Sequence, residues 1–461
     1  MENIGWNNIT TDEAARLCLE GECVTTEERR ALAMERLKDL VAYAKEHSPY
    51  YSEAYRNIGD AFELQDLPTT SKGLLMADYE RWVTDPMITY EGVTNYIKDP
   101  DSLGKLYLGK YTALTTSGTT GKPMPMVRDA GHNKIHGALM QTRFLRETDP
   151  DLMVPIRHKI ATVIFKDPSI SSYSGFLKTK LAYPDYEENM LDISLTENVD
   201  EIVRKLNEFQ PELITGYPSV MGSLAKAADA GRLKIHPKAV ACSAEKLKDN
   251  VYQALKDTFG CPILNNYCST EGGEAAMACS EGKLHINDDW VIIEPVDRDG
   301  RPVPEGEWSD GILITDLTNY VQPVIRYYMG DRIRIVPQKC GCGSTLPVME
   351  IMGRSYDNLI VGEKELFGVN IEYLLMYIKG VYSIQLVQKN AREFELRMIA
   401  SQEGKEAELF EEAKEILLSF FEENGCGPIK ITLSDQPPVH SHRGGKVKFI
   451  VQEKEIAGEK E

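Results

Sequence analysis

Short apolar runs alternate with helical patterns over much of this chain, from about residue 111 to residue 349. Examples of the apolar runs are residues 159–165, 213–216, 239–243 and 262–266. Continuous apolar runs between amphipathic helical segments are typical of strands that helices cover on both faces. The alternation therefore predicts an α/β fold with buried strands.

A β-rich stretch follows, and the pattern then changes once more. Predicted strands separated by Gly, Pro and Asp turns occupy residues 291–295, 312–316, 324–328 and 332–336. After Gly353 we predict two strands, a helix and a third strand, at residues 383–388, 393–399, 405–422 and 428–433. We therefore expect a large N-terminal α/β domain with a β-rich distal part (residues 1–353) and a small α+β C-terminal domain (residues 354–461).

Residues 1–110 are predicted to be a helical and irregular lead-in to the large domain. Residues 25–46 have the periodicity of an amphipathic helix, and Thr25 with Glu28 forms a capping box at its start. Residues 47–70 carry Pro and Gly at several positions and are predicted to be an irregular connector.

The bulk properties exclude several classes of function. The formal net charge is −19 over 461 residues, whereas nucleic acids and anionic membranes select basic surfaces. We expect no nucleic-acid partner and no membrane partner. The chain has no run of about 18 apolar residues and no signal peptide at its start. The nine cysteines are odd in number and scattered, so we expect a reducing, cytoplasmic location.

Residues 115–123, with the sequence TTSGTTGKP, form the most distinctive segment. Two glycines allow tight turns in which successive backbone N–H groups face one anion. The surrounding hydroxyl groups and one lysine suit the triphosphate of ATP. The spacing differs from that of the Walker loop, and a flexible linker is the alternative interpretation.

A second segment, residues 266–273 (NYCSTEGG), directly follows a predicted strand. Active sites of open α/β sheets lie beyond the carboxyl ends of the strands. Tyr267 offers a ring for a base, Thr270 a hydroxyl for a phosphate, and Glu271 an oxygen ligand for Mg²⁺. Taken alone, the segment is equally consistent with an ordinary turn.

Two more segments complete the set. Residues 326–332 (RYYMGDR) contain Asp331, whose carboxylate can accept both hydroxyls of a ribose, and Arg354 follows downstream. Residues 443–448 (RGGKVK) place a lysine on a glycine-rich turn, where its charge can meet negative charge that develops in a reaction. Alone, these segments indicate no more than a surface ion pair and a basic turn.

Together and in this order, the four segments resemble those of the adenylate-forming superfamily, which includes acyl-CoA synthetases, peptide-synthetase adenylation domains and luciferases. Residues 47–51 (HSPYY), 67–72 (LPTTSK) and 214–219 (ITGYPS) are similar to segments of phenylacetate–CoA ligases and their relatives. The resemblance covers nearly the whole chain. It implies a large domain and a small mobile C-terminal domain, with the site between them.

The resemblance also implies roles for individual residues. The ATP phosphates would be held by Thr116, Ser117, Gly118, Thr119, Thr120, Gly121 and Lys122. The rest of the nucleotide would meet Ser243, Ala244, Glu245, Asn266, Tyr267, Asp331 and Arg354. Thr270 and Glu271 would contact phosphate and Mg²⁺. The adenylation lysine would be Lys446, with Lys448 as the neighbouring candidate.

The activity implied by the resemblance is ATP-dependent conversion of a carboxylic acid to its acyl-AMP, with release of pyrophosphate, followed by transfer to CoA. The acid pocket would include Tyr173, Phe176, Tyr217 and Pro218. Tyr173, Phe176, Tyr217 and Tyr267 indicate an aromatic ring in the acid without identifying it. A homodimer is one alternative for the assembly.

The position just after the Gly353–Arg354 pair departs from the family pattern. The family hinge usually carries Asp or Lys, whereas Tyr356 takes that place here. The thioester step is therefore less firmly implied than adenylation. One alternative is an adenylating enzyme that passes the activated group to an amine, a carrier protein or a cofactor hydroxyl. Another is a non-catalytic nucleotide-binding protein. Four intact residues argue against it: Glu271, Asp331, Arg354 and Lys446.

The sequence also contains a candidate zinc site and a histidine pair. Three thiols and one imidazole would complete a closed tetrahedral site, from the residues Cys279, His285, Cys340 and Cys342. The Cys-x-Cys spacing is shorter than the common gap, and four unrelated residues are the alternative. His132 and His136 would share one helix face. Without an acidic residue between them, we expect an ordinary exposed or pocket-facing pair.

Overall fold

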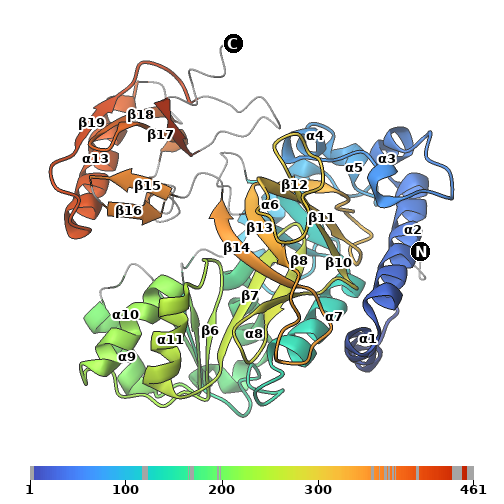
Figure 1. The fold of residues 1–461 in the computed structure, drawn as a ribbon, viewed down its shortest axis with the longest axis horizontal. Coiled ribbons are helices and arrows are strands. Elements are labelled where there is room, and N and C mark those ends of the chain that lie inside the picture. The colour runs from blue at the N-terminus through green and yellow to red at the C-terminus, as the bar shows by residue number, and fades with distance from the viewer. Residues whose placement is uncertain are drawn as a thin grey trace. The chain divides into compact units, whose positions relative to one another are not determined.

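The structure, a computed structural model, describes residues 5–116, 123–164, 166, 171–194, 197, 199–354, 358–362, 364–367, 371, 374–375, 378, 380–400, 404–438 and 449–453. The chain forms two compact units (Figure 1). Unit 1 comprises Met1–Thr70, Asp78–Thr116 and Pro125–Met352. Unit 2 comprises Ser71–Ala77, Ser117–Met124 and Gly353–Glu461.

Short helices form most of the first hundred residues. They are α1 (Thr11–Cys23), α2 (Thr26–His47), α3 (Pro49–Ala54), α4 (Lys72–Ala77), α5 (Tyr79–Trp82) and α6 (Tyr90–Lys98). The capping box of Thr25 and Glu28 at the start of α2 is confirmed. The prediction of an irregular connector over residues 47–70 is wrong in part, because α3 begins there. Ser48 caps it and Pro49 occupies its first position, a combination that favours a helix start.

A nine-stranded sheet is the centre of unit 1 among the described residues. Its strands are β3 (Ile160–Ile164), β4 (Met190–Ser194), β5 (Leu213–Gly216), β6 (Ala239–Cys242), β7 (Ile263–Ser269), β8 (Gly273–Ala278), β9 (Leu284–Ile286), β13 (Asp331–Val336) and β14 (Val348–Arg354). The spatial order is β13-β14-β9-β8-β7-β6-β5-β3-β4. The half from β4 to β7 is parallel, as the buried apolar runs indicated.

Helices α9 (Val199–Phe209), α10 (Pro218–Asp229) and α11 (Asp249–Phe259) share a core with the parallel half. Helix α8 (Ser171–Ala182) is joined to β4 by the hydrogen bond from Tyr173 to Asp192. Leu206, Leu224 and Leu255 from three of these helices join Val163, Ile214 and Val240 from the strands in one buried cluster. This core fixes the carboxyl ends of the parallel strands, where the candidate nucleotide residues lie.

In the other half of the sheet, β13 matches the strand predicted at residues 332–336, whereas β8, β9 and β14 were not predicted. β7 pairs with β8, β8 with β9, and β9 with β14, all in antiparallel orientation. A hairpin and a second sheet complete unit 1: β1 (Thr112–Thr115) with β2 (Pro125–Arg128), and β10 (Val291–Val296), β11 (Gly311–Asp316) and β12 (Tyr327–Met329). The strand predicted at 324–328 starts late, since Arg326 has a φ of +46°.

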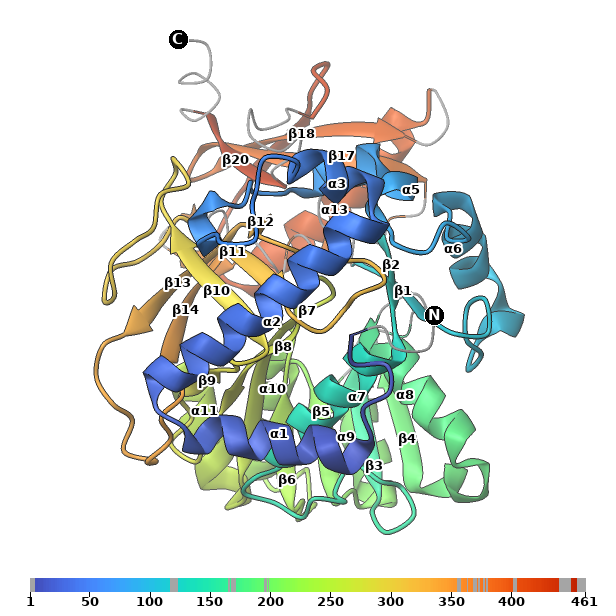
Figure 2. The same ribbon diagram turned by 90° about the vertical axis from the view of Figure 1, so that its right-hand side faces the viewer.

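The long helix α2 lies against the segment that precedes β10 (Figure 2). Arg36 of α2 donates to the backbone oxygen of Asp289 at 2.5 Å, and its guanidinium lies 3.5 Å from the ring centroid of Trp290. Helix α2 is therefore part of the packed body of unit 1.

Unit 2 contains a mixed four-stranded sheet of order β19-β18-β17-β20. Its elements are β15 (Asn358–Val361), β16 (Lys364–Phe367), β17 (Val381–Asn390), β18 (Glu393–Ala400), α13 (Glu406–Glu423), β19 (Lys430–Leu433) and β20 (Ile450–Gln452). Leu417 and Phe421 of α13 pack with Phe394 and Leu396 of β18. The predicted fold class is confirmed. No described helix combines the length and the apolar content that a bilayer crossing requires.

Candidate functional site

The turn between β7 and β8 carries Thr270 and Glu271. The N–H of Gly272 donates to the hydroxyl of Ser269 at 2.8 Å, and Gly273 has a φ of +60°, which favours glycine. The side chains of Thr270 and Glu271 are partly exposed. A ligand at the edge of the sheet can therefore reach both.

Two tyrosine hydroxyls join the second and third sequence segments. Tyr267 of β7 donates to Oδ2 of Asp331 at 3.0 Å. Tyr327 of β12 donates to Oε1 of Glu271 at 3.3 Å. The structure thus brings together carboxylates that stand 60 positions apart in the chain, between residues 271 and 331. These hydrogen bonds hold both carboxylates in place.

The base of the first segment is tied to the same turn. Thr116 is buried and directly follows β1, whereas residues 117–122 lie outside the described residues. In the β1–β2 hairpin, Thr115 pairs with Pro125 and Thr112 with Arg128. Nη2 of Arg128 donates to the backbone oxygen of Thr270 at 2.9 Å. Thr115 lies three residues along β1 from Thr112, which pairs with Arg128. The start of the 117–122 segment is therefore about 10 Å along the strand from Arg128.

Five of the residues predicted to meet the rest of the nucleotide lie directly after β6 or within β7. The register pairs Gly216 of β5 with Cys242 of β6, and Cys242 with Asn265 of β7. The residues that come next are Tyr217, Ser243 and Asn266, so they meet at one edge of the sheet, followed by Ala244, Glu245 and Tyr267. Ala244 has a φ of +69°, which is strained for a residue with a side chain and common near binding sites.

The predicted acid-pocket residues do not form one described cluster. Tyr173 and Phe176 on α8 are buried, with parallel rings whose centroids are 6.5 Å apart. The hydroxyl of Tyr173 donates to Oδ2 of Asp192 in β4 at 3.1 Å. Burial and the charge of Asp192 raise the pKa of Tyr173 to about 12. Tyr217, with Pro218 behind it, lies two strands away at the end of β5.

Several predicted site residues lie outside the described residues. They are Ser117, Gly118, Thr119, Thr120, Gly121, Lys122, Tyr356, Lys446 and Lys448. Arg354 is described only as the last backbone position of β14. The roles given to these residues stay predictions.

The four candidate zinc ligands are close together. Their ligand atoms all lie within 4.8 Å of one another. Sγ of Cys279 is 3.7 Å from Sγ of Cys340, and Sγ of Cys342 is 3.4 Å from Nε2 of His285. With bonds of about 2.3 Å to sulfur and about 2.0 Å to nitrogen, a tetrahedral zinc separates two sulfurs by about 3.8 Å and a sulfur from a nitrogen by about 3.5 Å. The residues fit such an ion.

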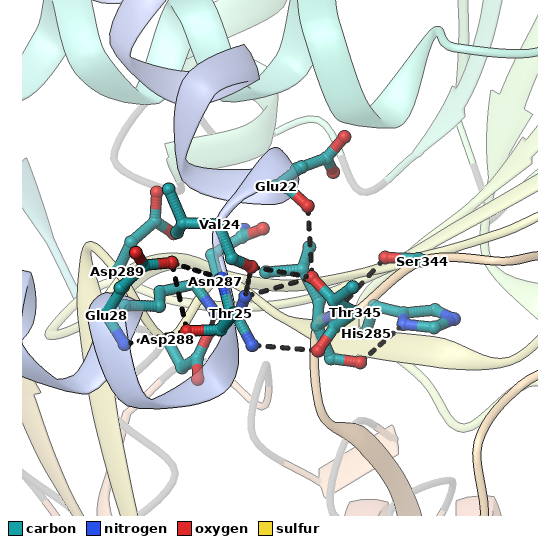
Figure 3. Close-up of polar contacts among 12 residues, drawn as sticks. Glu22, Val24, Thr25, Glu28, His285, Asn287, Asp288, Asp289, Ser344 and Thr345 are labelled. Atoms are coloured by element: carbon teal, nitrogen blue, oxygen red, sulfur yellow. Dashed lines mark hydrogen bonds and ion pairs between the residues drawn. The ribbon is translucent and has the colours of Figure 1, made fainter.

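The surroundings of this cluster also suit a metal. Nδ1 of His285 lies 2.9 Å from the backbone oxygen of Leu346, so Nδ1 carries the proton and Nε2 faces the thiols. Zinc-bound histidines usually make such an outer hydrogen bond. The loop of residues 340–345, which carries Cys340 and Cys342 and is called the Cys loop below, contacts the α1–α2 turn through Thr345. The hydroxyl of Thr345 donates to the backbone oxygen of Glu22 at 3.0 Å (Figure 3). Arg29 donates to the backbone oxygen of Thr345 at 2.8 Å.

The histidine pair on α7 (Ala130–Leu139) is buried, so the expectation of an exposed or pocket-facing pair is wrong. The missing acidic partner comes from β11: Oδ2 of Asp316 lies 3.0 Å from Nδ1 of His132. Burial lowers the pKa of His132 to about 3, so its ring is neutral. His136 accepts the N–H of Glu274 at Nδ1 with a distance of 2.9 Å. Its Nε2 therefore carries the proton and does not suit a metal.

Comparisons with known proteins give a consistent result. No protein-family model matches the chain. The phenylacetate-coenzyme A ligase of Thermus thermophilus is 26% identical over 378 residues, which cover 78% of each chain. The enzyme of the same name from Escherichia coli is 26% identical over 373 residues, covering 76% of this chain and 77% of that protein. Protein CapK of Staphylococcus aureus is 25% identical over 229 residues, and the match spans about half of it (48%).

Solved structures of 2-hydroxyisobutyryl-CoA ligase share the fold. One, in complex with 2-HIB-AMP and CoA in the thioesterification state, is 18% identical, covers 95% of this chain and 93% of that chain, and has a TM-score of 0.55. Another, an open conformation with the same ligands, is 17% identical, covers 94% and 93%, and has a TM-score of 0.53. At this identity the likeness concerns the fold.

Proposed function

The chain belongs to the phenylacetate–CoA ligase-like family of the adenylate-forming superfamily, and from that premise we propose that it activates a carboxylic acid with ATP and transfers the acyl group to CoA. The observation that carries the proposal is the pair of tyrosine–carboxylate bonds, Tyr267 to Asp331 and Tyr327 to Glu271. They link the ring proposed to stack on the base, the proposed ribose acceptor and the proposed magnesium ligand at one edge of the sheet.

In the first step, an oxygen of the substrate carboxylate attacks the α-phosphorus of ATP. The bond from that phosphorus to the bridging oxygen breaks, and pyrophosphate leaves. Glu271 would hold Mg²⁺, which would neutralise phosphate charge, Thr270 would meet phosphate, and Asp331 would accept the ribose hydroxyls. Residues 116–122 hold the phosphates, and Lys446 supplies a positive charge. Positioning and charge neutralisation account for the catalysis, because this reaction needs no side-chain nucleophile.

In the second step, the thiolate of CoA attacks the acyl carbon of the acyl-AMP, and AMP leaves with the bonding electrons. We propose an aromatic acid as the substrate, bound near Tyr217 and Pro218, with Tyr173 and Phe176 supplying a further apolar wall. The alternative acceptors, an amine, a carrier protein or a cofactor hydroxyl, are outcomes of the test described below.

We further propose a structural zinc held by Cys279, His285, Cys340 and Cys342. The spacing of the ligand atoms supports it. With four protein ligands the ion has no open position, so it stabilises the fold and takes no part in the chemistry. It would tie the turn after β8 to the loop that contacts α1 and α2.

Exchange of labelled pyrophosphate into ATP tests the first step. The purified protein is assayed with panels of aromatic and aliphatic acids, with and without CoA, and next to Glu271→Gln. We expect acid-dependent exchange in the wild type, a loss of about 10²-fold or more in the variant, and acyl-CoA when CoA is added. Exchange without acyl-CoA would indicate another acceptor. No exchange with any acid, despite intact folding, would overturn the proposed function.

A further inference from the structure

We propose that His136 is a positioning residue for the turn that carries Thr270 and Glu271. The inference rests on the proposed function, since it concerns the same magnesium site. It assigns a role to a side chain of α7, about 135 positions before the turn in the chain, that does not touch the substrate.

The first observation is an irregularity in β8. Cys268 pairs with Glu274, but Tyr267 pairs with Ala276, so β8 has one extra residue. Such a bulge disrupts the hydrogen bonds of the ladder locally. Two side chains form hydrogen bonds with the backbone of Glu274 where the ladder is disrupted. Its N–H donates to Nδ1 of His136 at 2.9 Å, and its backbone oxygen accepts from Nδ2 of Asn287 at 2.6 Å.

The second observation is the chain of bonds behind His136. Because Nδ1 accepts, the proton is on Nε2, which lies 3.2 Å from Oγ1 of Thr318. The hydroxyl of Thr318 donates to Oδ1 of Asp316 at 2.5 Å. Both donors, Nε2 of His136 and the hydroxyl of Thr318, belong to a chain of hydrogen bonds that ends at the carboxylate of Asp316. Burial alone would raise the pKa of Asp316, but its contacts with His132 and His136 hold it well below the ordinary value. The chain keeps His136 as an acceptor towards the turn.

The third observation is the packing of the ring directly under the turn. A Cβ at Gly273 would lie 2.2 Å from Cε1 of His136, so only glycine fits there. On its other side the ring contacts His132, with centroids 4.1 Å apart. Arg128 of the β1–β2 hairpin donates to the backbone oxygen of Thr270. His136 and Arg128 therefore fix the backbone on both sides of Glu271 without contacting the ligand.

The expected consequence is a change in magnesium binding. Loss of the imidazole would leave the partly buried N–H of Glu274 without this acceptor, and the turn would shift to recover a partner. A metal ligand three residues away would move with it. Outer-shell partners of metal ligands typically contribute about 10- to 100-fold to metal affinity.

The experiment compares His136→Leu with His132→Leu and His136→Asn. His132 is a matched control, because it is equally buried on the same helix and does not bond to the turn. Asn offers an acceptor oxygen near the position of Nδ1. The readouts are the Mg²⁺ concentration for half-maximal pyrophosphate exchange, the melting temperature, and amide hydrogen exchange at Glu274.

We expect His136→Leu to need about tenfold more Mg²⁺ and to exchange the Glu274 amide faster. His132→Leu should lower the melting temperature but change both readouts much less than His136→Leu, because His132 contacts Thr318 and Asp316 and does not bond to the turn. His136→Asn should recover part of the magnesium response. Equal Mg²⁺ requirements in His136→Leu and wild type would overturn the role of His136 alone. An inactive wild type would overturn the proposed function and this role with it, while the amide exchange would still report whether the hydrogen bond exists.

Discussion

The tyrosine hydroxyls that bind Glu271 and Asp331 give each carboxylate a separate test. Tyr327→Phe removes one donor to the proposed magnesium ligand, and Tyr267→Phe removes one donor to the proposed ribose acceptor. A hydrogen bond to a charged group contributes about 1.5–3 kcal/mol, or at least about tenfold. We expect Tyr327→Phe to raise the Mg²⁺ requirement and Tyr267→Phe to raise the KM for ATP. Steady-state pyrophosphate exchange measures both quantities. The assignment would be contradicted if Tyr327→Phe raised the KM for ATP and Tyr267→Phe raised the Mg²⁺ requirement.

The proposed adenylation lysine is tested by comparing Lys446→Ala with Lys448→Ala. Removing one positive charge from the transition state should cost about 10²–10³ in the rate of acyl-AMP formation. Thioester formation from supplied acyl-AMP should be spared in Lys446→Ala, because the charge is needed only in the first step. If Lys448→Ala shows the loss and Lys446→Ala does not, the assignment of this turn is wrong by two positions.

His132 predicts a dependence of stability on pH. An unfolded histidine titrates near a pKa of about 6.5, whereas burial lowers the pKa of folded His132 to about 3. Between these values only the unfolded chain takes up the proton, so stability is lost as the pH falls below about 6.5. The charged and titratable groups that face His132 are His136, Asp316 and Arg128.

Denaturant unfolding at pH 7, 6 and 5 checks this prediction. Relative to His132→Leu, the wild type should lose up to about 1.4 kcal/mol of unfolding free energy per pH unit below pH 6. Parallel pH curves for the two proteins would show that another group accounts for the acid sensitivity.

Single residues also mark the limit of what the sequence predicts about the site. Thr270, Glu271 and Asp331 could be proposed, because each stands in a short segment whose residue types suit a nucleotide. Arg128 and His136 could not, since their partners Thr270 and Glu274 are more than 130 positions away. Local spacing shows that two histidines share a helix face, but it does not show what that face contacts.

At the scale of elements, the Cys loop predicts a stability effect. We expect about one zinc per chain by elemental analysis of protein that has not met a chelator. Cys340→Ser should remove the zinc and lower the melting temperature by roughly 5–10 °C, while the rate of pyrophosphate exchange changes little. Cys23→Ser is the control, because Cys23 is an exposed thiol. Metal at background levels in the wild type would overturn the zinc site.

The sheet shows why half of its strands could be predicted. β3, β5, β6 and β7 are buried apolar runs, and helices on both faces require that composition. β8, β9 and β14 are antiparallel, and β9 has only three residues, Leu284–Ile286. Their pairing depends on a bulge and on a partner some sixty positions away. Neither property appears in a local hydrophobic pattern.

At the scale of the whole molecule, the step from adenylation to thioester formation is proposed to need a change in domain arrangement about Tyr356. Hinges absorb large changes in φ and ψ at a few positions. Proline fixes φ near −65°, so Tyr356→Pro should allow one arrangement and hinder the other. Because the ring of Tyr356 would be buried in one arrangement and uncovered in the other, we expect the adenylating arrangement to be favoured without CoA.

The two half-reactions, assayed separately, check the hinge. Tyr356→Pro should keep acid-dependent pyrophosphate exchange within about threefold of wild type and lose most acyl-CoA formation from supplied acyl-AMP, about tenfold or more, as expected when only the conformational step is blocked. Tyr356→Asp is the matched control, since aspartate is a usual residue of the family hinge, and it should keep both half-reactions. Equal loss of both in a folded Tyr356→Pro protein would mean that the pivot lies elsewhere. Retention of both would mean that the thioester step requires no change at this position.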